Sequence, residues 1–470
     1  MTTRSLGISL IGLLIAGCAV GPDYRRPEID LPGQFVGAPV GSADAVSLAS
    51  QNWREVFADP GLQKLIDEAL TAAPDALLAV ARLREAEAMA GVSRAPLFPQ
   101  ASVSLTTSPT ARLPNDSLTS IFQGGAGISW EIDLWGRYRR ASEAARADLL
   151  ASEDALYGMQ ASLIASVARY YFQLATLHDT FAITERGARN QAEVLRLVQR
   201  LSAAGISTAA EERLQESALA TTEASLPTLR RQIAETENAL AVLIGRYPGA
   251  LQMDAPPQLR LPDQIPAGLP SSLLEQRPDI RQAEARLIAA NARVGEAKAM
   301  FFPSLSLTAL FGGISTSLSE VVKGRAPDVA SVGPNLLLPL FSGGKLYFNR
   351  EAAQARLDQE VIGYRKTILN ALGEVANGLV AYETSNDLIA KQATRVTASR
   401  EAMRLAELRF RIGTTNFLEV LDAQRQLLTA ETQQAQALLE KRLALVSIYL
   451  ALGGGWQADP QCAVLYCRDG

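Results

Sequence analysis

The sequence has 470 residues, of which 48% are hydrophobic and 20% charged, and its formal net charge is −4. This composition is typical of a globular protein of two or three domains. The slight acidity, without a basic stripe interleaved with aromatic residues, gives no reason to expect a nucleic-acid partner.

The first 17 residues are typical of an export signal. Arg4 precedes the apolar run "LGISLIGLLIAGC", which is too short for a transmembrane helix. The run ends in small residues followed by Cys18, and this ending resembles the bacterial lipoprotein box. The resemblance implies cleavage before Cys18 and attachment of lipid to its thiol. Ala19 at the next position implies sorting to the outer membrane. An ordinary signal peptide with a chance cysteine is the alternative.

Beyond Cys18, no apolar run approaches the roughly 18–20 residues that a spanning helix needs. The longest candidate, "LLLPLF" at 336–341, is interrupted by a proline. Any membrane crossing must therefore use strands, because only helices and closed barrels satisfy their backbone groups in lipid.

The chain resembles itself. "APD" at 73–75 recurs as "RPD" at 277–279, an offset of 204, and Gly205 recurs as Gly413, an offset of 208. Landmarks in the same order with nearly constant offsets indicate an internal duplication. We therefore predict two repeats over 61–250 and 271–455, a linker over 251–270, an N-terminal segment over 18–60 and a tail over 456–470.

Each repeat begins with an alanine-rich amphipathic helix, predicted over 62–95 and 271–300 and ended by Pro99 or Pro303. Alternating residues then predict a strand over 101–107 or 304–310. A second strand is predicted over 125–135 or 331–341. Trp130, Trp135 and Phe341 suit an aromatic belt at a membrane surface, although two buried hairpins of a soluble sandwich are the alternative.

A long helix follows, predicted over 138–202 and 346–411, and some 65 residues at 1.5 Å each reach about 100 Å. Its second copy places apolar residues at a strict step of seven: Val361, Ile368, Val375, Tyr382, Ile389, Val396, Met403 and Phe410. Such a repeat imposes left-handed supercoiling. The chain turns at Gly205 or Gly413, and after Gly413 it returns as a helix over 417–453.

Four strands per chain cannot close a barrel, since closed bacterial barrels begin at about eight strands. Three copies would supply 4 × 3 = 12 strands, with the long helices forming the wall of a tunnel. We therefore predict a mainly α fold with a membrane β-barrel part, completed by an oligomer, for which a homotrimer would supply the twelve strands.

Three stretches carry a family resemblance: "GCAVGPDYRRP" at 17–27, "RPDIRQAEARLIAANARVGEAKAMFFPSLSL" at 277–307 and "RIGTTNFLEVLDAQRQLL" at 411–428. They resemble the TolC/OprM outer-membrane efflux family, nearest to the NodT-type lipoproteins of tripartite RND efflux systems. The resemblance implies a TolC-like trimeric α/β barrel that spans the outer membrane and extends into the periplasm. It implies a passive exit duct for drugs or other small molecules. The implied partners are a periplasmic adaptor, an inner-membrane RND-type pump and outer-membrane lipid.

The resemblance also implies roles for residues near the two glycine turns. Glu419 and Asp422, with Glu211 and Phe410, would form the periplasmic aperture. Phe410 replaces a frequent tyrosine and cannot donate a hydrogen bond, and Thr415 replaces a basic residue, so a polar latch is not expected. The expected adaptor-docking residues are Leu201, Ser202, Gly205, Ile206, Ile412, Gly413 and Thr414.

No pattern predicts catalysis, a metal site or a cofactor. "FSGGKLY" at 341–347 lacks the spacing of a phosphate loop, and His178 has no partner motif. Cys462 and Cys467 are either joined by a disulfide or remain two free thiols.

A type I protein secretion channel and a lipid-anchored coiled-coil scaffold without a pore are the alternative functions.

Overall fold

The computed structural model describes residues 19–37, 47–111, 118–249, 261–262 and 265–456. The chain divides into two compact units. The strand unit comprises Arg82–Asp154, Gln282–Lys366 and the described part of Met1–Ile29. The tip unit comprises the described parts of Asp30–Ala81, Ala155–Arg281 and Thr367–Gly470. Cys18, Cys462 and Cys467 lie outside the described residues.

The same succession of elements occurs twice, as the internal repeat predicts. The first repeat contains α3 (Pro60–Ala72), α4 (Pro74–Arg94), β1 (Gln100–Ala111), β2 (Leu118–Ile132), α5 (Arg137–Ala203) and α6 (Ala209–Leu243). The second contains α7 (Leu273–Gln276), α8 (Pro278–Ala299), β3 (Ser304–Ser315), β4 (Asp328–Leu337), α10 (Lys345–Arg411) and α11 (Phe417–Ala451). Shorter elements are α2 (Trp53–Val56), α9 (Leu318–Val322) and the 3-10 turns η2 (Leu48–Ser50), η3 (Ala95–Leu97) and η4 (Pro270–Ser272).

The prediction of one continuous helix over 62–95 and another over 271–300 is wrong in the same place in both repeats. Ala73, with ψ of 132°, separates α3 from α4, which begins at Pro74. Arg277, with ψ of 120°, separates α7 from α8, which begins at Pro278. A proline ring clashes with a helical conformation of the preceding residue, so each predicted helix divides at its X-Pro bond.

The long helices are confirmed. They run over Arg137–Ala203 and Lys345–Arg411, each within one residue of the predicted range at both ends. Ile368, Val375, Tyr382, Val396 and Met403 of the predicted seven-residue series are all buried. A second buried series lies three residues further along and includes Tyr364, Ala371, Ser385, Ser399 and Ala406. The two series together form the a and d positions of a heptad, so α10 packs as a helix of a coiled coil.

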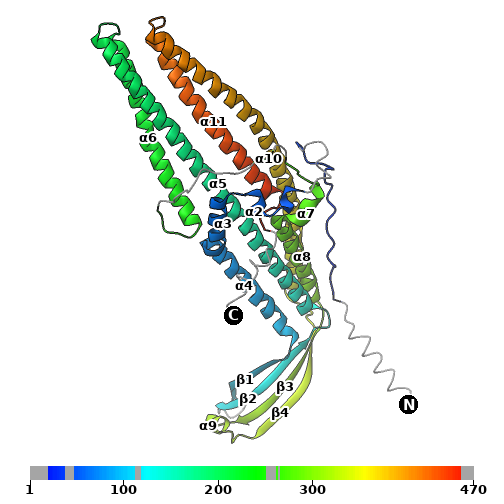
Figure 1. Cartoon of the computed structure of the whole chain (residues 1–470). Coiled ribbons are helices and arrows are strands. Elements are labelled where there is room, and N and C mark those ends of the chain that lie inside the picture. Colours follow the sequence, from blue (N-terminus) through cyan, green and yellow to red (C-terminus); the bar gives the residue numbers. More distant parts are fainter. Residues whose placement is uncertain (1–18, 38–46, 112–117, 250–260, 263–264, 457–470) are drawn as a thin grey trace. The chain divides into compact units, whose positions relative to one another are not determined.

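The strands form one antiparallel sheet in the order β1-β2-β3-β4, and the pairing of β2 with β3 joins the two repeats (Figure 1). All four predicted strands exist, but their bounds differ from the predicted ranges. β4 ends at Leu337 rather than at residue 341, because Pro339 cannot donate to a ladder. β2 ends at Ile132, and Gly136, with φ of 78°, then turns the chain into α5.

The N-terminal segment is fixed along the strand unit. The Val20 amide donates to the Trp135 carbonyl at 3.0 Å, and the Asn291 side chain donates to the Pro22 carbonyl at 2.9 Å. The Arg26 guanidinium makes two hydrogen bonds, each 2.7 Å, to the Glu284 carboxylate. Trp135, whose carbonyl accepts the hydrogen bond from the Val20 amide, stacks on Phe302 with ring centroids 4.8 Å apart. The segment is therefore ordered to within two residues of Cys18.

Candidate functional site: a two-faced sheet and two helical turns

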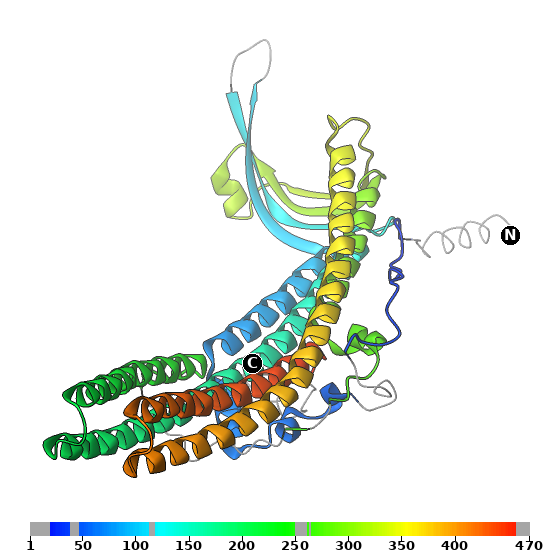
Figure 2. The same cartoon turned by 90° about the horizontal axis from the view of Figure 1, so that it is seen from above.

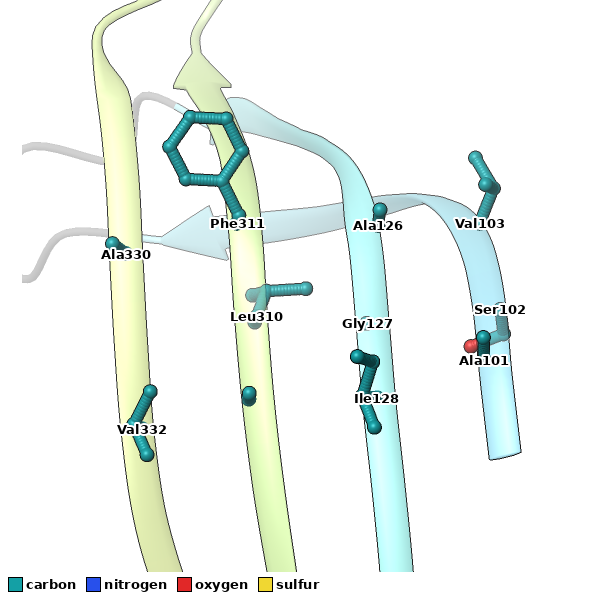
Figure 3. A pocket seen from close by; sticks show the side chains of 11 residues that line it. Ala101, Ser102, Val103, Ala126, Gly127, Ile128, Leu310, Phe311, Ala330 and Val332 are labelled. Carbon is teal, nitrogen blue, oxygen red and sulfur yellow. The ribbon is translucent and has the colours of Figure 1, made fainter. Parts of the chain in front are cut away.

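One face of the sheet is apolar and exposed. Alternation along each strand and the antiparallel register bring the same kind of side chain to the same side. The apolar face consists of Ala101, Val103, Ala126, Ile128, Ala309, Phe311, Ala330 and Val332 in its central part (Figure 3). Val103 is 86% exposed, Phe311 64% and Val332 77%. A contiguous exposed apolar surface of this kind marks a protein or membrane interface.

The opposite face is polar, with few aliphatic side chains. Its central residues include Ser102, Ser104, Ser129, Ser306, Thr308, Ser331 and Asn335. Near the end of β2 it carries Glu131, which accepts from Arg137 at 3.0 Å and from the Tyr138 hydroxyl at 2.9 Å. The sheet has two open edges, β1 and β4. An exposed apolar face, a polar opposite face and unpaired edges are features that a segment of a closed barrel would have.

The two helical turns lie at the same end of the tip unit, and Figure 2 shows the pairs α5–α6 and α10–α11 side by side (Figures 1 and 2). Gly205 has φ of 70° and Gly413 has φ of 75°, the left-handed conformation that glycine adopts without strain. The Ile206 amide donates to Leu201 O and the Thr414 amide to Arg409 O, both at 2.9 Å. These bonds close the ends of α5 and α10 and leave the turns compact.

The turns present apolar side chains to solvent. Ile206 is 74% exposed and Ile412 64%. Gly205, Gly413 and Thr414 are exposed beside them, while Leu201 and Ser202 are half-buried. An ideal Cβ built on either glycine would meet no atom within 4 Å, so these positions are open on the outside.

The first turn uses its carboxylate as a helix cap. Glu211 accepts from the Thr208 amide at 2.8 Å and from the Ser207 hydroxyl at 2.6 Å, and its own amide donates to the Thr208 side chain. This is a capping box, which satisfies free amides at the start of α6. The hydrogen bond from Ser207, followed by that from Thr208, lowers the pKa of Glu211.

The second turn uses the corresponding carboxylate between helices. Glu419 of α11 accepts from Arg409 of α10 at 2.7 Å and contacts the Thr415 hydroxyl. One turn further, Asp422 accepts from Arg425 at 2.6 Å and from Gln426 at 2.5 Å. The Arg425 guanidinium is the main cause of a lowered pKa at Asp422. Glu419 and Asp422 therefore each have a cationic neighbour in their own chain, whereas Glu211 is held by Ser207 and Thr208.

Phe410 is a packing residue. Its ring meets the edge of Phe417, with centroids 5.5 Å apart and planes at 61°. It lies against a buried cluster that includes Val198, Met403 and Val420. The cluster joins α5, α10 and α11 near the turns.

Arg409 and Arg425 are the site residues that sequence reasoning missed. Arg409 precedes Gly413 by four residues, so the reversal of the chain brings it opposite Glu419. Arg425 follows Asp422 by three residues on one helix, which is the spacing of neighbouring side chains. Both signals were present in the sequence.

The structure adds no metal site and no spanning helix in the part of the chain that it describes. No helix of the described ranges is both long and apolar enough to cross a bilayer. Within the same ranges, His, Cys, Asp and Glu do not gather in groups that could hold a metal ion.

Comparisons with known proteins all match this chain to outer-membrane efflux proteins. The model of the outer membrane efflux protein family matches residues 65–246 and again 269–454. The toluene efflux pump outer membrane protein TtgC of Pseudomonas putida is 35% identical, over 99% of this chain and 99% of its own length. The cation efflux system protein CusC of Escherichia coli is 32% identical, over 95% and 98%. The solved outer-membrane channel OprN is 33% identical, with a TM-score of 0.84 over 94% of this chain and 100% of its own.

Proposed function

The chain belongs to the outer membrane efflux protein family, and on that premise we propose that three copies close into one channel, anchored by lipid and gated at the helical turns. The coarser function follows from membership. The protein is the outer-membrane exit duct of a tripartite efflux system, works with an adaptor and an inner-membrane pump, and is not an enzyme.

The observation that carries the trimer proposal is the two-faced sheet. Its apolar face is exposed over four strands, and the edges β1 and β4 have no partner strand in the sheet. Open edges are not tolerated in lipid, and four strands are too few to close. If β4 of each copy pairs with β1 of the next, three copies give twelve strands. The apolar face then meets lipid and the polar face lines the lumen.

The turns are the proposed adaptor contacts. Ile206 and Ile412 are exposed apolar side chains beside glycines that leave the surface open. A helical hairpin of the adaptor can approach closely there, because nothing projects from Gly205 or Gly413. Leu201, Ser202 and Thr414 complete the proposed contact.

The aperture is proposed to be a ring of mixed charge. Three copies would bring six carboxylates of Glu419 and Asp422 near one axis, where a charged ring favours ions of opposite sign. Arg409 and Arg425 offset part of that charge within each chain. The packing of Phe410 on Phe417 holds α10 against α11 at this level. Opening therefore requires breaking the exposed pair of Arg409 and Glu419 and sliding an apolar contact.

The lipid anchor is proposed at Cys18. Val20 is hydrogen-bonded to Trp135 at the junction of β2 and α5, so a lipid on Cys18 would start beside the sheet. Trp135 and Phe302 stack there and suit a membrane surface. Cys18→Ser should leave an unprocessed precursor. Normal cleavage with labelled lipid in that variant would contradict the anchor.

The cargo is proposed to be drugs or other small molecules. The names of the relatives mention toluene and cations, which are small cargoes and favour efflux over protein secretion. They differ from each other, so the cargo of this chain does not follow from them.

The function is tested by expressing the protein, with its adaptor and pump, in cells that lack their own exit duct. We expect lower drug accumulation than with the pump alone, and discrete conductance steps from the purified protein in a planar bilayer. Unchanged accumulation without conductance would favour the scaffold, whereas conductance with export of a protein substrate would favour a secretion channel.

A further inference from the structure

The loop between β3 and β4 folds back onto the sheet through its short helix α9. An ideal Cβ on Gly124 of β2 would lie 2.6 Å from Cγ1 of Val321, and one on Gly313 of β3 would lie 2.9 Å from Cβ of Ala326. Glycine at both positions makes room for the loop. Leu105 is the register partner of Gly124, so its side chain and the loop share one side of the sheet. That side is the apolar face.

The helix is also apolar on its outer side. Leu318 and Val322 are four residues apart and therefore share a face of α9. They are 42% and 69% exposed, while Val321 turns toward the sheet. These two side chains lie next to the apolar face and enlarge the contiguous apolar surface that it exposes.

Two cations follow the helix directly. Lys323 and Arg325 are exposed, and in the ranges that the structure describes neither is paired with a carboxylate. Glu320, the one acidic residue of the sequence from 316 to 327, is half-buried. Its backbone carbonyl accepts from the Arg325 and Ala326 amides, which fixes the cationic segment next to α9.

The depth of the loop along the strands fits a membrane boundary. The other ends of β3 and β4 connect to α8 and α10, so the loop lies at the end away from the helices. From Leu305 to Gly313 is 313 − 305 = 8 residues, or about 20 Å of depth for a strand tilted by about 40°. The apolar band of an outer-membrane barrel is about 25 Å tall. With Leu305 taken as the edge of the band on the side of the helices, helix α9 comes within about 5 Å of the opposite edge, where acyl chains give way to headgroups.

We propose that α9, together with Lys323 and Arg325, binds a phosphate-bearing lipid of the outer leaflet. Leu318 and Val322 contact its acyl chains and extend the apolar face, and the two cations contact its phosphates. The inference rests on the proposed function, since it requires the apolar face to meet lipid. A lipid is favoured over a protein partner because the apolar surface continues without a break from the sheet onto the helix.

The proposal is tested by replacing Val322 with the photoreactive residue p-benzoylphenylalanine and irradiating cells that express the full chain. We expect an adduct that stains for phosphorylated outer-leaflet lipid. The matched control carries the same residue at Ser104, which is exposed on the polar face next to Leu105. No lipid adduct at position 322, a protein adduct instead, or equal lipid adducts at both positions would overturn the proposal.

The contribution of the cations is tested in the same assay with Lys323→Glu and Arg325→Glu combined. The yield of lipid adduct from position 322 should fall about 25-fold or more, since each of the two cations near an anionic surface contributes about fivefold. An unchanged yield would overturn phosphate binding. Conductance of this variant should stay at the wild-type value. Normal conductance without a lipid adduct at 322 therefore counts against the lipid site alone, whereas absent conductance in the unmodified protein counts against the channel itself.

Discussion

At the α5–α6 turn, Glu211 completes a capping box with Thr208, whereas at the α10–α11 turn its counterpart Glu419 reaches across to Arg409. The two carboxylates are related by the repeat offset, 419 − 211 = 208, as are the two turn glycines. The same offset pairs Arg409 with Leu201 and Arg425 with Ser217, so the arginines that face the carboxylates occur only at the second turn.

This difference suggests a division of roles. A capping box belongs to one helix end and breaks only when α6 frays. The pair of Arg409 and Glu419 joins two helices through side chains that are 52% and 41% exposed. An exposed ion pair contributes only about 0–1 kcal/mol, so it can break without unfolding either helix. The second turn is thus suited to movement, and the first to holding its shape.

The largest effect is expected from Gly413→Val. A β-branched residue at φ of 75° is strained by roughly 1 kcal/mol or more, and its side chain would project into the open docking surface. Drug efflux should be lost while the amount of protein in the outer membrane stays normal. Gly413→Asn is the control, because asparagine tolerates this conformation better. Retained efflux in Gly413→Val would move the docking surface elsewhere.

The next effect concerns the carboxylates. Glu419→Ala combined with Asp422→Ala should weaken cation selectivity, and also block by cobalt hexammine added from the periplasmic side, because the ring would lose its charge. Glu211→Ala, which removes a carboxylate that caps α6, should weaken both properties less than the double variant does. If single-channel recordings show unchanged selectivity and block in the double variant, the constriction lies at other residues.

A smaller effect is expected from Arg409→Leu, which gives the second turn the residue found in the first. Loss of an exposed pair should raise the open fraction of the channel by up to about fivefold. Leu201→Arg is the reciprocal variant and should not change the open fraction, because Glu211 is already held by Ser207 and Thr208. A lower open fraction in Arg409→Leu would show that the pair favours the open state.

The smallest effect is a pH dependence at the first turn. The pKa of Glu211 is lowered from its ordinary value of 4.5, mainly by the Ser207 hydroxyl. Its folded-state pKa lies below its unfolded value, so its contribution to stability is present above pH 4.5 and is lost as pH falls through the lowered pKa. The protection of the amides at the start of α6, measured relative to their intrinsic exchange rates at each pH, should therefore fall below pH 4.5. Glu211→Gln should flatten this response, and an identical response in both proteins would assign it to another group.

Local patterns carried much of the fold. The seven-residue step predicted which side of α10 is buried. Gly205 and Gly413 predicted both turns, because glycine readily adopts the left-handed backbone conformation that such turns need. Both features depend on nearby residues. The X-Pro breaks at Ala73 and Arg277 were equally local but were overlooked within long amphipathic runs. The position of α9 could not be predicted, since it depends on the close approach of Val321 to Gly124, two residues far apart in the sequence.

In the candidate site, too, the features set by neighbouring residues were predicted, and those set by residues distant in the sequence were not. The strand alternation predicted a two-faced sheet, and the predicted turn residues do lie at the turns. Whether a carboxylate caps its own helix or pairs with another depends on the residue across the turn. At 201 that residue is leucine and at 409 it is arginine, a distinction that the glycine motif alone does not contain.

The central proposal is that three chains, each supplying four strands, close into one barrel. The mass of the protein extracted in mild detergent, corrected for bound detergent, measures this directly. We predict a complex of three chains that stays intact until it is unfolded. A stable, folded single chain, with its apolar sheet face covered only by detergent, would contradict the account.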